Sequence, residues 1–164
     1  MERKLLGIYL NDHLAGASFG AGLADRIAHR HQDSVAGPEL ARLAREITED
    51  RRALLDVMTA LGVPARRYKV YGGRVAERLG LLKLNGSLYR RSGLSTVIEL
   101  ETLRLGVEGK SLVWRTLLDV EEAQEDLDRP RVRTLLDRAH AQIDLLAGLR
   151  TTAAVRVFQS LPGA

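Results

Sequence analysis

Apolar residues recur every three or four positions along most of this chain, which is the spacing of residues on one face of an α-helix. Five stretches show this pattern, and glycine, proline, serine or aspartate residues separate them. Pro38 and Pro130 each open such a stretch, and proline is favoured in the first turn of a helix. Gly62 and Pro64 end the second stretch, as a C-cap glycine and a proline beyond it would. The pattern predicts an all-α protein with helices over residues 4–31, 38–61, 67–84, 94–118 and 130–158.

The same periodicity predicts which residues are buried. The stripe of the first helix includes Leu5 and Ile8, and that of the helix over 94–118 includes Leu105 and Leu112. We expect these four side chains to face the core.

Three glycines, Gly16, Gly20 and Gly22, lie inside the first predicted helix. An interior glycine destabilises a helix by about 1 kcal/mol relative to alanine. We predict that these glycines allow a neighbouring helix to approach closely.

Composition agrees with one helical domain over residues 1–164. Apolar residues make up 45% of the chain and aromatic residues only 4%, which favours helix packing over a β-sandwich. The sequence contains no cysteine, which excludes disulfides, thiolate metal sites and cysteine nucleophiles. The N-terminus runs directly into an amphipathic pattern, and no apolar run reaches the roughly 18 residues that a membrane span needs. We expect a cytoplasmic protein.

Positive charge is concentrated in one part of the chain. The formal net charge is +4, but residues 64–91 hold eight basic residues against one acidic residue, together with three tyrosines. Such a segment can bind an anionic surface, either nucleic acid or a membrane. Alternatively, it covers an acidic face of the remaining helices. The candidate contacts for an anionic ligand are Arg66, Arg67, Lys69 and Arg74.

Several acidic residues and one histidine lie on or beside the predicted apolar stripes. Asp12, Asp50, Glu101 and His140 are the main examples, one on each long helix. Charged groups rarely enter a core unless they are paired, hydrogen-bonded or bound to a metal. Further candidates share these faces at helical spacing: Glu46, Glu49, Glu108 and Asp137.

Two predicted hairpins joined by about 30 residues form a layout that resembles the ferritin-like superfamily, a four-helix bundle with a long crossover. Its di-metal members use one Glu from each of two helices and a Glu-x-x-His from each of the other two. The resemblance implies an iron or manganese site. Its ligands would be Asp12, Glu101, Asp137-x-x-His140 and Glu46-x-x-Glu49 or Asp50. The chain departs from the pattern because helix 38–61 has no histidine and aspartate replaces glutamate at two positions.

Basic residues on or beside the same faces give a second interpretation, in which the buried charges are ion pairs. Asp50 or Glu101 could pair with an arginine, Glu108 with His140 or Arg138, and Asp137 with Lys110. The other basic residues concerned are Arg51, Arg104, Arg115 and Arg150. We favour this interpretation, which makes the protein a non-enzymatic bundle that self-associates as a homo-oligomer. The metal protein and the anionic-surface binder remain the alternatives.

Overall fold

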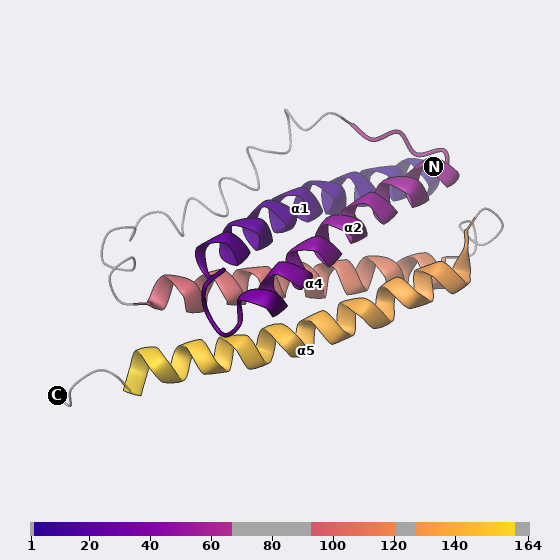
Figure 1. Cartoon of the computed structure of the whole chain (residues 1–164). Helices are drawn as coiled ribbons and strands as arrows, with labels where there is room; N and C mark the ends of the chain where they lie inside the picture. The colour runs from indigo at the N-terminus through magenta and orange to yellow at the C-terminus, as the bar shows by residue number, and fades with distance from the viewer. Residues whose placement is uncertain (1, 67–92, 121–126, 160–164) are drawn as a thin grey trace.

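The computed structural model describes residues 2–66, 93–120 and 127–159, and in these ranges it contains four α-helices and no strand (Figure 1). They are α1 (Glu2–Arg30), α2 (Gly37–Ala60), α4 (Leu94–Asp119) and α5 (Arg129–Gln159). The all-α bundle predicted from the sequence is confirmed. The helix predicted over 67–84 lies outside the described residues. No helix in the described ranges is long and apolar enough to cross a membrane.

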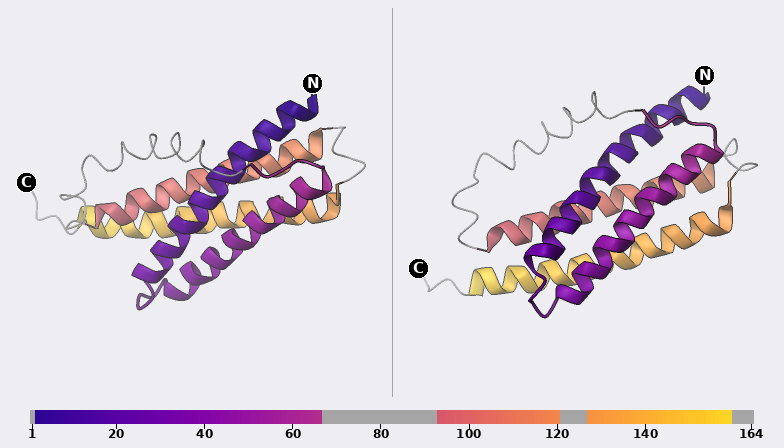
Figure 2. Two further views of the ribbon diagram at one scale, coloured as in Figure 1. Left: turned by 90° about the horizontal axis from the view of Figure 1, so that it is seen from above. Right: turned by 45° about the horizontal axis from the view of Figure 1, so that its top comes forward.

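The helices form two hairpins that lie in two layers. The members of each hairpin, α1 with α2 and α4 with α5, run in opposite directions (Figure 1). Viewed from above, the α1–α2 hairpin crosses the α4–α5 hairpin diagonally (Figure 2). The backbones of α1 and α4 approach closely, whereas those of α2 and α5 are farther apart. Long polar side chains therefore bridge the space between α2 and α5.

Leucine, alanine and valine form most of the core between the layers. Leu10, Leu14 and Ile27 of α1 are almost fully buried, as are Leu103 and Trp114 of α4. Each set repeats at helical spacing, so one face of each helix turns inwards. Burial of this apolar surface is the main stabilising contribution to the fold.

The apolar stripes predicted for α1 and α4 were wrong in part. Leu5 and Ile8 of α1 are 59% and 36% exposed, and Leu105 and Leu112 of α4 are 69% and 56% exposed. On α4 the buried line runs instead through Val97, Leu100, Leu103 and Val107 and on to Trp114. Residues seven apart share a face, so Leu105 and Leu112 are exposed together on the outer side of α4.

Among the described residues, no helix approaches the glycines of α1 closely. A Cβ atom added at Gly16 or Gly20 would meet no described atom within 4 Å, and one at Gly22 would meet only the side chain of Arg26. Gly37 is the position where space is limiting, because a Cβ there would lie 2.3 Å from the carbonyl oxygen of Gln32. The tight connection between α1 and α2 therefore requires glycine at its end.

Candidate functional site

A cluster of charged and amide side chains lies in the interior where α2, α4 and α5 meet. Its centre is Asp50 of α2, whose side chain is 0% exposed. Lys110 of α4 and Gln142 of α5 are also largely buried, and Arg138 of α5 is partly buried. The cluster is the most deeply buried set of ionisable groups in the part of the chain that the structure describes.

Both carboxylate oxygens of Asp50 accept hydrogen bonds from the other hairpin. Arg138 donates to Oδ1, and Lys110 donates to Oδ2. Gln142 Nε2 also donates to Oδ2, at 3.2 Å, while Gln142 Oε1 accepts a hydrogen bond from Lys110. Hydrogen bonds that involve charged groups are stronger than neutral ones. Asp50 is thus satisfied entirely by residues of α4 and α5.

Two further carboxylates surround this centre. Glu46 accepts a hydrogen bond from Gln142 at 3.0 Å and pairs with Arg42 at 3.3 Å. Glu49 accepts one from Arg138 at 3.1 Å. These two carboxylates and that of Asp50 carry three negative charges. Lys110, Arg138 and Arg42 carry three positive charges, so the cluster is electrically neutral overall. A neutral, hydrogen-bonded set is the form in which charges are tolerated inside a protein.

The pairs form an ordered seam along the facing sides of α2 and α5. Asp56 pairs with Arg131 at 2.6 Å, Asp50 pairs with Arg138, and Glu46 meets Gln142. Along the seam the residue numbers fall on α2 while they rise on α5 by similar steps. This is the register of two antiparallel helices. A shift of one helix by a single turn would break every pair.

Burial lowers the pKa of Lys110 below its usual value, and the positive charge of Arg138 adds to this effect. Attraction by Asp50 opposes the shift. The ammonium group donates to Asp50 and Gln142, so its nitrogen is engaged with the protein itself. The geometry is that of an internal ion-pair network, with no nucleophile placed beside a base.

Asp50 is the only one of the four principal charged candidates that is buried as expected. Its pairing with Arg138 agrees with the ion-pair interpretation. Glu101 is half-exposed and accepts a hydrogen bond from Arg150 at 2.8 Å. Asp12 and His140 are exposed. Each of the two lies one residue along its helix from a buried position, and this rotation about the helix axis turns its side chain towards solvent.

The other predicted pairs form differently. Glu108 pairs along its own helix with Arg104 at 3.1 Å and contacts neither His140 nor Arg138 in the described structure. Lys110 pairs with Asp50, while Asp137 is exposed on α5. The cause is the rotation of α5, whose buried line runs through Leu135, Ala139, Gln142 and Leu146 and leaves Asp137 and His140 outside.

The proposed metal ligands are not brought together. Within the described ranges, no group of three or more His, Cys, Asp or Glu side chains is arranged to hold a metal ion. Glu46, Glu49 and Asp50 share one helix face, but Lys110, Arg138 and Gln142 satisfy them. Asp12, Asp137 and His140 are exposed, and Glu101 pairs with Arg150.

Two buried amides were missed by the sequence reasoning. Gln142 is 2% exposed, and Asn11 is 5% exposed. Asn11 donates to the carbonyl oxygens of Gly7 at 2.8 Å and Pro64 at 3.2 Å and accepts from the backbone N–H of Arg66 at 2.7 Å. The sequence did contain a signal for their burial, because each amide interrupts a line of apolar residues at helical spacing. Arg66 itself is exposed, and Arg67, Lys69 and Arg74 lie outside the described residues.

His13 of α1 lies at the contact with α4. Its ring meets that of Tyr9 edge-on, with centroids 4.5 Å apart, and Tyr9 donates to the Thr116 hydroxyl of α4 at 3.3 Å. Burial lowers the pKa of His13, and the charge of Asp12 opposes the shift. His13 is therefore a packing residue of the α1–α4 contact.

The fold and the cluster define an all-α four-helix bundle with an internal ion-pair network. Comparison with protein-family models found no matching family, and comparisons with curated proteins and with solved structures found no match either.

Proposed function

We propose that the protein is a non-catalytic helical bundle in which the Asp50 cluster holds the two hairpins in a single register. The observation that carries this proposal is the complete burial of Asp50, whose two oxygens are both occupied by residues of the opposite hairpin. Buried polar groups of this kind specify one arrangement of helices, because any other leaves them unpaired. The role is structural and belongs to the seam between α2 and α5.

The energetics of buried ion pairs give a sharp test. Removing one partner of such a pair typically destabilises a protein by about 3–5 kcal/mol, since it leaves an uncompensated charge. Replacing the whole set by apolar residues of similar volume is often neutral or stabilising. A structural network should therefore be sensitive to a single change and tolerant of complete replacement.

We expect Asp50→Asn to lower the free energy of unfolding by about 3 kcal/mol or more, because Lys110 and Arg138 lose their shared carboxylate. Urea unfolding followed by circular dichroism measures the change. Glu49→Gln is the matched control, since Glu49 lies on the same helix and also pairs with Arg138 but is exposed. Its loss should be below about 1 kcal/mol. Equal losses in the two variants would contradict the proposal.

A fourfold apolar variant completes the test. It combines Asp50→Leu, Lys110→Met, Arg138→Leu and Gln142→Leu. We expect it to regain most of the stability that Asp50→Asn loses but to show broader amide resonances, because the hairpins lose their unique register. A fourfold variant with one sharp set of resonances would show that the cluster does not determine the register.

The order of hairpin, long connection and hairpin supports an architectural likeness to the ferritin-like superfamily. In Figure 1, α2 and α4 run in the same direction, as expected when a connection returns along the bundle. We extend this likeness to the fold alone, because shared architecture is a weak guide to function. Cytoplasmic location and the binding of nucleic acid or membrane through residues 64–91 remain predictions from the sequence.

Self-association is a second candidate function, and the outer face of α4 favours it. Leu105 and Leu112 are 69% and 56% exposed there, seven residues apart, with Glu101 and Arg115 on the same side. If α4 met a second copy antiparallel, Leu105 would face the other Leu112 and Glu101 would come near the other Arg115. Such a face is self-complementary, as a two-fold dimer requires.

We expect the purified protein to sediment as a dimer and Leu105→Gln combined with Leu112→Gln to sediment as a monomer. Analytical ultracentrifugation over a range of concentrations measures both. Val155→Gln is a control, because Val155 is also exposed but lies on α5. A wild-type monomer at high concentration, or a double variant that still dimerises, would exclude this interface.

A further inference from the structure

The contact between α1 and α4 has a histidine near each of its ends. His13 lies against Gly109 of α4 at one end, and His31, which directly follows α1, lies against Thr96 at the other. Among the described helices, α1 and α4 make the closest backbone approach between the two hairpins. Imidazole is the side chain that ordinarily changes charge near neutral pH. The two histidines are therefore the groups of this contact that respond to mild acid.

The surroundings of His13 suit a neutral ring. The ring is half-buried and meets that of Tyr9 edge-on. A Cβ atom added at Gly109 would lie 4.0 Å from His13 Cε1, so the ring lies over the backbone of α4. In the described ranges, no group forms a hydrogen bond with this ring. An imidazolium at this place would carry its charge between two helices without an acceptor, which is costly.

One charged group acts on His13, the carboxylate of Asp12 on the same helix. Asp12 is exposed, and its attraction raises the pKa of His13 less than burial lowers it. On α4, Gly109 carries no charge, and the flanking charges of Glu108 and Lys110 are paired with other residues. Burial therefore holds the pKa of His13 below its ordinary value of 6.5.

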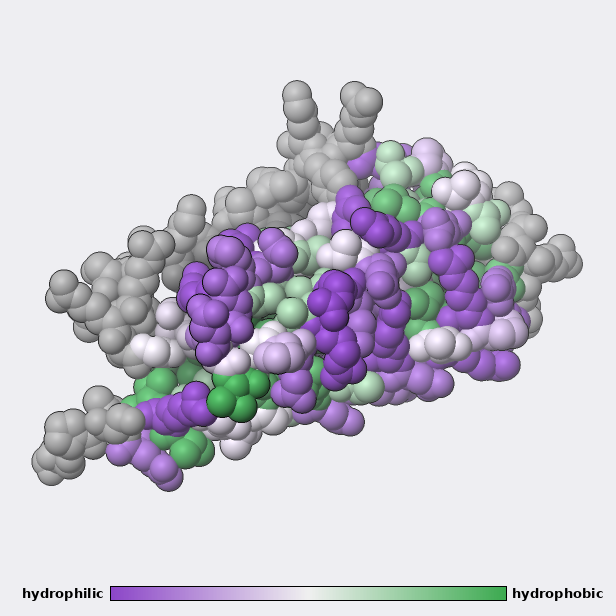
Figure 3. Space-filling view, viewed as in Figure 1, coloured by the Kyte–Doolittle hydropathy of each residue, from purple (hydrophilic) through white to green (hydrophobic). Residues whose placement is uncertain are grey.

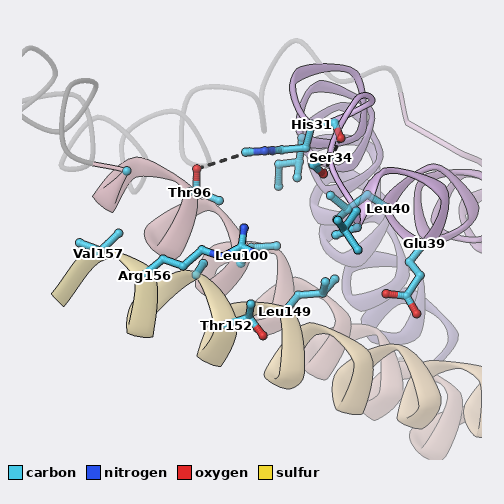
Figure 4. Close-up of a pocket in the computed structure, with 15 residues that line it drawn as sticks. His31, Ser34, Glu39, Leu40, Thr96, Leu100, Leu149, Thr152, Arg156 and Val157 are labelled. Atoms are coloured by element: carbon cyan, nitrogen blue, oxygen red, sulfur yellow. Dashed lines mark hydrogen bonds between the residues drawn. The ribbon is translucent and has the colours of Figure 1, made fainter. Parts of the chain in front are cut away.

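His31 has different surroundings, because its end of the contact is open. A cleft of about 390 Å³ lies between the α1–α2 connection, the start of α4 and the end of α5, and His31 lines it (Figure 4). Apolar surface over the C-terminal part of α5 borders this region (Figure 3). The His31 ring points towards Thr96, with Nε2 3.4 Å from Oγ1. Both nitrogens of an imidazolium donate hydrogen bonds, so His31 keeps this partner when it takes up a proton.

We propose that His13 makes the α1–α4 contact acid-sensitive at one end: proton uptake by its ring separates α1 from α4 around Gly109, while the contact at Thr96 stays closed. The Asp50 cluster also stays closed. It contains no histidine, so none of its side chains ordinarily changes charge between about pH 5 and pH 7. Mild acid then opens the bundle at one place and leaves the hairpins joined elsewhere. The proposal does not depend on the structural role of Asp50.

Proton linkage gives the direction of the effect. A released His13 has the ordinary pKa of 6.5, whereas the packed ring has a lower pKa. As the pH falls through 6.5, the released form binds a proton first, and the packed form loses stability relative to it. Above this pH both forms are neutral and the contact has its full strength.

A titration of the full-length protein from about pH 8 to about pH 5, followed by NMR, observes both histidines in one sample. We expect the His13 Hε1 resonance to titrate with a midpoint below 6.5. The NOE between the His13 ring and the Gly109 Hα atoms should lose about half its intensity or more by the end of the titration. The NOE between the His31 ring and the Thr96 methyl group should persist throughout, which makes His31 the internal control.

Two variants separate proton uptake from packing. His13→Phe keeps an aromatic ring against Tyr9 but takes up no proton, so its NOE to Gly109 should persist in acid. Thr116→Val is the matched control, because it removes the acceptor of the Tyr9 hydrogen bond in the same contact. It should weaken the NOE equally at both ends of the titration. Unfolding curves identify a variant that fails to fold, and the wild-type titration then decides the matter alone.

Several results would overturn the proposal. A His13 midpoint at or above 6.5 would show that the packed form does not disfavour the proton. An NOE to Gly109 that persists in the wild type at the acidic end would show that the contact stays closed. The same loss in His13→Phe would assign the acid response to another group. Equal changes at Gln142 and Leu146 would show that acid loosens the whole bundle.

Discussion

Lys110 carries its charge where water scarcely reaches, with 13% of its side chain exposed. Because burial lowers its pKa in the folded protein, the unfolded chain keeps this proton to a higher pH than the folded chain does. Between the lowered pKa and the ordinary value near 10.5, the unfolded state binds more protons. The contribution of Lys110 to the free energy of unfolding therefore rises as the pH rises through that window. Below the window this contribution is constant.

We expect the stability of the wild type relative to Lys110→Met to increase as the pH rises towards 10.5, the ordinary pKa of lysine. Urea unfolding of both proteins at several pH values measures the difference. Lys4→Met is the matched control, because Lys4 is an exposed lysine of α1 and the relative stability should stay flat for it. A relative stability that falls with pH would mean that pairing with Asp50 outweighs burial.

The position of Asp50 in the core could be predicted from the sequence, since it continues an apolar line of α2 in both directions. Its partners could not be chosen in advance. Several basic residues lay on candidate faces, and the choice depends on how far one hairpin slides along the other. That distance is set by side chains from three helices at once.

At the scale of single helices, the existence of all four described helices was predicted within a few residues. Their rotation was predicted less well. On α4, leucine occurs on both the inner and the outer face, so hydrophobicity alone assigned Leu105 and Leu112 to the core. The inner face of α4 is distinguished by valine and tryptophan, Val107 and Trp114, which fill the narrow space between the layers.

Glycine positions give an element-scale prediction. We expect Gly16→Ala to raise the free energy of unfolding by up to about 1 kcal/mol, because alanine favours the helix and its Cβ meets no described atom. Gly37→Ala should lower it by about 1–3 kcal/mol, since the new Cβ overlaps the Gln32 carbonyl oxygen. Thermal unfolding measures both changes.

Gly148→Ala serves as a second exposed site, because a Cβ there also meets nothing within 4 Å. It should behave like Gly16→Ala. Destabilisation by Gly16→Ala but not by Gly148→Ala would show that a further element of the molecule packs on α1 at this point.

At the scale of the whole molecule, the two hairpins follow from the short connections between their helices. The diagonal crossing of the layers does not follow from any local pattern (Figure 2). It depends on the close α1–α4 approach on one side and on the bulky polar side chains between α2 and α5 on the other. Sequence periodicity describes each helix separately and carries no information on such an angle.

The seam between α2 and α5 also has a consequence for how the chain folds. Contacts within each hairpin join residues that are close in sequence, and such contacts form early. Asp50 and Arg138 are 88 residues apart, and their hydrogen bonds require both hairpins to be in place. The seam is therefore expected to form after the transition state, where it slows unfolding without hastening folding. The network would then act chiefly on the lifetime of the folded molecule.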